Sequence, residues 1–138
     1  DAVENILSTM NSVSKGNEQV RTVIGCGGNR DKEKRPVMAE IAASNSDRVL
    51  FTSDNPRNED PEQILNEMMA GLAPRHMRKV MRNTDRREAI RAACQLAQPN
   101  DIILLAGKGH ENYQEIQGIK HPFDDKQILS EMLAIMNA

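Results

Sequence analysis

The sequence predicts an α/β fold, namely a Rossmann-like three-layer domain with a mostly parallel sheet, helices on both faces and a C-terminal β-hairpin. Two observations predict this class. Short β-prone apolar runs alternate along the chain with segments whose apolar residues recur at helical spacing. Connections of helix length join parallel strands and place helices on both faces of a sheet. The length of 138 residues suits one domain with a single hydrophobic core.

The first half of the chain alternates helix and strand signals. Residues 3–10 have apolar side chains at helical spacing and precede a predicted strand at 20–24. A helix is expected to start at Pro36, because proline is favoured in a first helical turn. The apolar run 48–53 predicts another strand, and Asp60 is expected to cap the helix after it. The residues predicted to be buried in these two helices are Val37, Met38, Ile41, Ala42, Ile64, Leu65, Met68 and Met69.

The second half continues the alternation and ends differently. A short strand is expected at 79–82, followed by a helix capped by Asp85 and a buried strand at 102–105. Residues 114–123 indicate a hairpin that turns at Gly118, and Asp124 is expected to start the last helix. The residues predicted to be buried in these helices are Ala89, Ile90, Ala93, Leu96, Ile128, Leu129, Met132 and Leu133.

Composition excludes several classes of protein. The formal charge is -2 and no dense basic block occurs, so a nucleic-acid partner is not expected. No apolar stretch approaches the roughly 20 residues that span a bilayer. Cys26 and Cys94 are too few for a disulfide framework, and the chain does not start with a positively charged leader. A reduced, cytoplasmic setting is therefore expected.

Three loops are expected to meet at one edge of the sheet, where ligands bind in open α/β folds. These loops are 25–35, 53–60 and 106–113. The second contains Asp54-Asn55-Pro56-Arg57 directly after a predicted strand. Asn55 offers a donor and an acceptor, and Arg57 offers a planar fork for a carboxylate or phosphate. The same four residues also suit a simple turn before the next helix.

The first loop runs from Gly25 to Pro36 between a strand and a helix, as in anion sites built from backbone amides. It fails the dinucleotide fingerprint because Arg30 stands where a third glycine is required. Its four basic residues would neutralise an anion or form a solvated face, and they are Arg30, Lys32, Lys34 and Arg35. Cys26, between glycines, is interpreted as a small packed residue.

The third loop contains Gly107-Lys108-Gly109-His110-Glu111, and it is not a Walker phosphate loop. The earlier glycine is missing, and Gly109 replaces the Ser or Thr that holds magnesium. Glu111 would accept hydrogen bonds from a ligand ammonium, and Gly107 would let the ligand approach the backbone. His110 is either a base, a metal ligand or a hydrogen-bonded loop residue.

Taken together, these motifs resemble the C-terminal domain of the Mur ligases. The similarity covers the whole chain and rests on Gly-Cys-Gly-Gly-Asn-Arg-Asp-Lys-Glu-Lys-Arg-Pro, Thr-Ser-Asp-Asn-Pro-Arg, Ala-Gly-Lys-Gly-His-Glu-Asn-Tyr-Gln and Phe-Asp-Asp. Within the family it resembles the type that adds the third amino acid of the peptidoglycan stem peptide. By this resemblance, Arg30, Asn55, Arg57, Gly107 and Glu111 match the family's amino-acid contacts. Asp54 and Pro56 complete the signature, whose Asp-Asn-Pro-Arg form is associated with meso-diaminopimelate.

The resemblance also implies a reaction and its partners. ATP phosphorylates a carboxylate of UDP-N-acetylmuramoyl-L-Ala-D-Glu, and the amine of meso-diaminopimelate attacks the acyl phosphate. We expect residues 1–138 to be the C-terminal domain of a bacterial cytoplasmic ligase, a monomer, without its N-terminal and central ATPase domains. ATP and magnesium would bind mainly to the central domain, so the fragment alone is expected to be inactive. The alternatives are a domain specific for L-lysine, a free-standing binding module and a Rossmann-type nucleotide enzyme.

Overall fold

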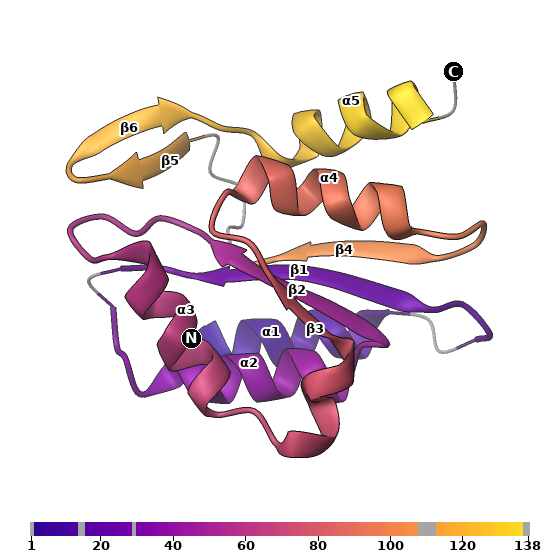
Figure 1. Ribbon diagram of the computed structural model, residues 1–138, viewed down its shortest axis with the longest axis horizontal. Helices are drawn as coiled ribbons and strands as arrows, with labels where there is room; N and C mark the ends of the chain where they lie inside the picture. The colour runs from indigo at the N-terminus through magenta and orange to yellow at the C-terminus, as the bar shows by residue number, and fades with distance from the viewer. Residues whose placement is uncertain (1, 14–15, 29, 108–112, 137–138) are drawn as a thin grey trace.

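A four-stranded parallel sheet forms the centre of the molecule, with strand order β3-β2-β1-β4. The computed structural model describes residues 2–13, 16–28, 30–107 and 113–136 (Figure 1). The strands of the sheet are β1 (Val20–Cys26), β2 (Arg48–Ser53), β3 (Val80–Arg82) and β4 (Ile102–Ala106). In this order β1 lies between β2 and β4, so the loops at the ends of these three parallel strands lie next to one another.

Helices cover both faces of this sheet, which confirms the predicted three-layer architecture (Figure 1). One face carries α1 (Ala2–Ser12), α2 (Lys34–Ser44) and α3 (Pro61–Ala70). The other face carries α4 (Arg86–Leu96) and α5 (Asp125–Met136), and a 3-10 helix, η1 (Pro74–Lys79), leads into β3. Two apolar clusters fill the spaces between the layers, one around Phe51 and the other around Ile90.

Local capping signals place the helix starts. The Asp60 side chain accepts a hydrogen bond from the Glu62 amide at 2.9 Å, and Asp85 accepts one from the Glu88 amide at 3.2 Å. Asp124 likewise accepts from the Lys126 amide at 3.1 Å at the start of α5. These side chains satisfy amides that have no partner within the helix, as predicted.

The predicted inward faces are partly wrong. In α2 the buried stripe runs through Arg35, Met38, Ala39, Ala42 and Ala43, and the helix begins two residues before Pro36. This spacing of three and four residues is the regular inward stripe of a helix, and the remaining predicted side chains lie beside it. The residues that are exposed against expectation are Val37, Leu96 and Leu133.

The strand β4 is an edge strand, not the fully buried strand that its apolar sequence predicts. Residues 102–105 are half-buried, and Ala106 alone in β4 is buried. Within the described part of the chain, β4 pairs with β1 on one side and with no strand on the other. Its apolar run is therefore covered by helices but open along one edge.

A C-terminal hairpin forms a separate two-stranded sheet, as predicted. It consists of β5 (Tyr113–Ile116) and β6 (Ile119–Pro122), paired antiparallel. Its turn contains Gln117 and Gly118 at φ of 50° and 80°, the positive values that a type I′ turn requires. Figure 1 shows the hairpin above the loops that connect β1 to α2 and β2 to α3.

The guanidinium of Arg86 joins three elements. It is almost fully buried, and its Nε and Nη2 atoms bind the two carboxylate oxygens of Asp125 at 2.8 and 2.5 Å. Its Nη1 atom donates to the Ser53 carbonyl at 3.0 Å. This one side chain therefore joins the starts of α4 and α5 to the end of β2.

We predict that Arg86→Met strongly destabilises the domain. The substitution leaves the Asp125 carboxylate and the Ser53 carbonyl without this donor, and breaking a buried pair costs about 3 to 5 kcal/mol. The control is Arg82→Met, because the Arg82–Glu62 pair at 2.9 Å is much more exposed, and such pairs contribute about 0 to 1 kcal/mol. Urea unfolding followed by circular dichroism measures both changes. Equal losses in the two variants would contradict this role for Arg86.

Candidate functional site

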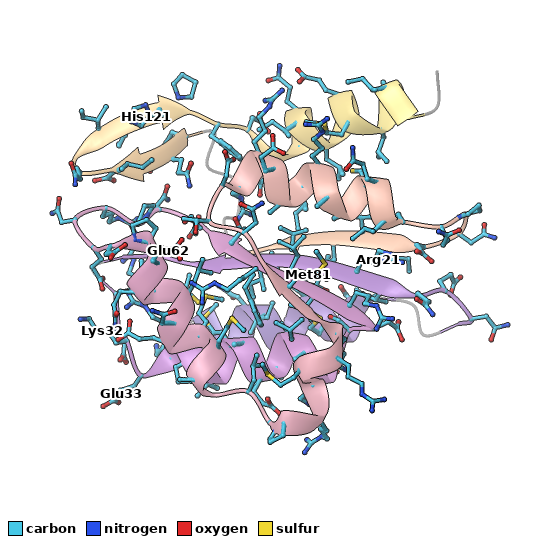
Figure 2. All side chains as sticks on the ribbon, in the orientation of Figure 1. Arg21, Lys32, Glu33, Glu62, Met81 and His121 are labelled. Atoms are coloured by element: carbon cyan, nitrogen blue, oxygen red, sulfur yellow. The ribbon has the colours of Figure 1, made fainter. Side chains whose placement is uncertain are left out.

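The three predicted loops meet in one pocket of about 410 Å³ at the carboxyl ends of the strands. Residues of mixed charge line it, among them Arg30, Lys34, Asp54 and Arg57, and Gly107 contributes backbone. Lys32 is close in sequence to Arg30 and Lys34, which line the pocket. Figure 2 shows Lys32 at the opposite end of the sheet from Arg21. The expected convergence of the loops is therefore found for the residues that the structure describes.

The glycine loop lies directly against the Asp54–Arg57 loop. The Gly28 amide donates to the Asn55 carbonyl at 2.7 Å. A Cβ atom on Gly28 would lie 1.8 Å from the Pro56 carbonyl oxygen, a distance that no side chain tolerates. The contact between the two loops therefore requires glycine at position 28. This contact explains the glycine without an anion-binding role for the loop.

Gly107 is required by a similar approach between β4 and β1. Its φ is +94°, and a Cβ atom there would lie 2.3 Å from the Gly25 carbonyl oxygen. The sequence suggested that Gly107 lets a ligand approach the backbone. Gly107 lines the pocket, so the approach of a ligand stays a prediction beside this close approach of the neighbouring chain segment.

The backbone of Arg57 is held in a left-handed conformation with φ of 53°. This region costs a non-glycine residue about 1 to 2 kcal/mol, and such strain is found where the surrounding structure enforces it. Here the hairpin enforces it, because the Arg57 amide donates to the Glu115 carbonyl at 2.9 Å and the Arg57 carbonyl accepts from the Gln117 amide at 2.6 Å.

The guanidinium of Arg57 is fixed on two sides. Its Nη1 atom donates to the Gly28 carbonyl at 3.0 Å and, more weakly, to the Asn55 carbonyl at 3.4 Å. Its Nε atom lies 3.7 Å from the Glu115 carboxylate, and the side chain is 16% exposed. None of the described residues accepts a hydrogen bond from Nη2. Arg57 lines the pocket, and the two N–H donors on its Nη2 atom have no acceptor among the described residues.

Asn55 and Asp54 also bind the hairpin, which the sequence did not indicate. The Asn55 side-chain oxygen accepts from the Glu115 amide at 2.8 Å, and the residue is 1% exposed. The Gln114 side chain donates to the Asp54 carbonyl at 2.8 Å. Gln114 and Glu115 are thus parts of the site that sequence reasoning missed, because a pairing over 60 residues leaves no local pattern.

The basic run after the glycines divides by function. Arg30 is exposed and lines the pocket, as does Lys34, whereas Lys32 lies 3.7 Å from Glu59. Arg35 is almost completely buried and forms ion pairs with Glu59 and Glu67. The interpretation of this run as one solvated face is therefore wrong for Arg35, which shares the inward stripe of α2.

Two other candidate residues fall outside the described chain. Glu111 and His110 lie outside the described residues. No cluster of His, Cys, Asp or Glu in the described chain is arranged to hold a metal ion. In the same residues no helix has the length and apolar character needed to cross a membrane.

Cys26 lines the pocket but is packed and protonated, as the sequence predicts. It is 5% exposed, and its Sγ atom lies 3.9 Å from the Met38 sulfur. Burial raises the pKa of the Cys26 thiol from 9.0 to about 12, with nearby Arg35 opposing the shift and Asp54 adding to it. A thiol in this state is not a nucleophile at neutral pH.

We predict that Cys26 resists alkylation in the folded domain at pH 8. Peptide mapping after iodoacetamide treatment should show modification only in the urea-unfolded control. Because the folded pKa of about 12 exceeds the ordinary 9.0, the contribution of this thiol to stability is present below pH 9 and is lost as the pH rises toward 12. Rapid labelling of native Cys26 at pH 8 would contradict the burial described here.

Comparisons with known proteins agree with these motifs. The model of the family described as "Mur ligase, glutamate ligase domain" matches residues 1–109. A 2,6-diaminopimelate ligase of UDP-N-acetylmuramoyl-L-alanyl-D-glutamate from Phocaeicola vulgatus is 59% identical over 134 residues, which cover 97% of this chain and 28% of that protein. The Aquifex aeolicus protein of the same name is 47% identical over 133 residues, or 96% of this chain and 27% of its own. The chain therefore spans little more than a quarter of the length of these curated relatives.

Solved structures place the fold in the same group. A UDP-N-acetylmuramoyl-L-alanyl-D-glutamate 2,6-diaminopimelate ligase matches 99% of this chain with a TM-score of 0.90 and 40% identity, over 28% of its own length. A domain of a Haemophilus ducreyi protein, 18% identical over 97% of this chain and 83% of its own, has a TM-score of 0.54 and supports the fold alone. On the family match over residues 1–109, this chain belongs to the Mur ligase family and contains its glutamate ligase domain.

Proposed function

We propose that this chain is the amino-acid-binding domain of a ligase that attaches meso-diaminopimelate to UDP-N-acetylmuramoyl-L-Ala-D-Glu. The observation that carries the proposal is the position of Arg57, which lines the pocket. Its Nη1 atom is held by the Gly28 carbonyl, and its Nη2 atom donates to no described residue. The names of the relatives that match 96 to 97% of this chain at 47 to 59% identity support the same substrate.

The charge pattern of the pocket suits a zwitterionic amino acid. Arg30 and Arg57 supply positive charge, while Asp54 supplies negative charge to the same pocket. Diaminopimelate differs from lysine by a carboxylate at the far end of its side chain, and an arginine fork binds carboxylates through charge-assisted hydrogen bonds. With Nη1 held by Gly28, we infer that Nη2 makes the principal contact with that carboxylate.

The remaining signature residues have distinct roles in this proposal. Gly107 shapes the pocket edge, and buried Pro56 and Asn55 hold the Arg57 loop against its neighbours. Direct contact of Asn55 with the amino acid is part of the proposal, although its side-chain oxygen already binds the hairpin. Glu111, which lies outside the described residues, is proposed as the acceptor of a substrate ammonium.

The chemical step needs more than this chain in the proposed scheme. ATP transfers its γ-phosphoryl group to a carboxylate of the uridine-linked dipeptide, and the diaminopimelate amine then displaces phosphate to form the amide. The sequence has no Walker loop, and the described residues contain no metal cluster, so we propose that residues 1–138 close over an ATP and magnesium site in other domains. These substrates point to the bacterial cytoplasm, and we expect the ligase to act there as a monomer.

We predict that Arg57→Ala selectively impairs diaminopimelate use in a full-length ligase that carries this domain. Loss of the charge-assisted contact should raise the KM for diaminopimelate about tenfold to a hundredfold, equivalent to about 1.5 to 3 kcal/mol. The KM for ATP should change little, and Arg57→Lys should rescue little because an ammonium lacks the planar fork. Steady-state kinetics with diaminopimelate and with L-lysine measure the change in preference.

The matched control is Arg48→Ala, at the opposite end of β2, where the side chain of this exposed residue donates a hydrogen bond to the adjacent Asp47 carbonyl and to no other described residue. This variant should retain the wild-type preference. The specificity proposal fails if Arg57→Ala leaves the ratio of rates for diaminopimelate and lysine unchanged. A wild-type ligase that uses lysine as well as diaminopimelate would contradict the proposed substrate itself.

A further inference from the structure

A buried arginine outside the proposed ligand contacts joins the two loops that hold Arg57. The Arg35 side chain is 2% exposed. Its Nη1 atom donates to Glu59 at 3.1 Å and to Glu67 at 2.6 Å. Its Nη2 atom donates to Glu59 at 2.8 Å and to the Gly27 carbonyl at 3.0 Å. The guanidinium therefore grips both Glu59 oxygens while it also binds the glycine loop.

Two of the three partners of Arg35, Gly27 and Glu59, lead by a short path to Arg57. Gly27 precedes Gly28, whose carbonyl accepts the hydrogen bond from Arg57 Nη1 at 3.0 Å. A Cβ atom on Gly27 would lie 2.9 Å from the same Nη1 atom, so this loop is in direct contact with the guanidinium. On the other side, the Glu59 amide donates to the Pro56 carbonyl at 3.0 Å, one residue before Arg57.

The charges around Arg35 show that its fork is committed to the protein. Burial lowers the pKa of Arg35, but hydrogen bonds and charge from Glu59 and Glu67 outweigh this and raise it above its ordinary value. Two carboxylates thus face one guanidinium, with Lys32 3.7 Å from Glu59 as a further cation. A buried ion network of this kind is weak evidence for stability. A role in holding the two loops in one conformation is the alternative hypothesis.

We propose that Arg35 is a positioning residue for substrate specificity: by binding the Gly27 carbonyl and Glu59, it holds the glycine loop and the Asp54–Arg57 loop in place and so sets the guanidinium of Arg57 for the distal carboxylate of the amino acid. This inference rests on the function proposed above. Recognition by an arginine fork needs its donors within about 0.5 Å of the productive position. Arg57 is held by the Gly28 carbonyl oxygen of the glycine loop, and Arg35 donates to the preceding carbonyl of that loop, Gly27.

The test is Arg35→Lys in the full-length ligase. Lysine retains the positive charge but cannot reproduce four hydrogen bonds from a planar fork. We expect the KM for diaminopimelate to rise about tenfold, because displacement of a recognition group by an ångström has effects of this order or larger. The preference for diaminopimelate over L-lysine should fall by a similar factor, with kcat and the KM for ATP nearly unchanged.

Two further variants keep the test decisive. Glu59→Gln retains the shape of the side chain but replaces a two-oxygen acceptor by one, so it should shift the preference in the same direction without removing Arg35. Arg21→Lys is the matched control, because Arg21 also forms an arginine–carboxylate contact, to Asp101 at 2.8 Å, but lies at the opposite end of the sheet (Figure 2). It should leave the preference unchanged, and melting temperatures establish that each variant is folded.

The outcomes separate this inference from the proposed function. If Arg57→Ala abolishes the preference while folded Glu59→Gln and Arg35→Lys both retain it, the positioning role is wrong and the proposed function stands. A general loss of kcat with both amino acids and with an unchanged ratio would also overturn it, because it indicates a purely structural role. A wild-type enzyme without preference for diaminopimelate would refute the proposed function, and the positioning role with it.

Discussion

The close contact between the glycine loop and the Asp54–Arg57 loop is the constraint on which the site depends. Gly28 packs against the backbone of Pro56, and its carbonyl accepts a hydrogen bond from the Arg57 guanidinium. Any side chain at position 28 would separate the loops, because its Cβ atom would overlap the Pro56 oxygen. The glycines of this loop therefore serve packing between two strand ends, and the arginine is positioned as a consequence.

The hairpin supplies the opposing support, so that Arg57 is set from two directions. Backbone hydrogen bonds to Glu115 of β5 and to Gln117 of the hairpin turn hold its left-handed conformation, while the Glu115 carboxylate lies 3.7 Å from its Nε atom. Arg86 in turn fixes the start of α5, which follows the hairpin in the chain, to the end of β2. A ligand that binds such a prearranged guanidinium does not have to order it, which favours affinity and selectivity together.

Features specified by short sequence segments were predictable, and features that depend on distant segments were not. The caps at Asp60 and Asp85 and the turn at Gly118 follow from local chemistry. The inward phase of α2 was misjudged because Arg35, placed in the loop before the helix as an anion-binding or solvated charge, is part of its buried stripe. The half-buried state of β4 depends on its place in the sheet order, which an apolar run does not reveal. The loop convergence was predictable because parallel topology dictates it, whereas the hairpin contacts to Asn55 required the tertiary structure.

The most direct measurement is a crystal structure of this domain, or of a ligase containing it, with bound meso-diaminopimelate. The account predicts the amino acid in the pocket lined by Arg30, Asp54 and Arg57, with its distal carboxylate within hydrogen-bond distance of Arg57 Nη2. It also predicts that Arg57 keeps its contact with the Gly28 carbonyl in the complex. A diaminopimelate molecule bound elsewhere, or with its distal carboxylate turned away from Arg57, would contradict the account.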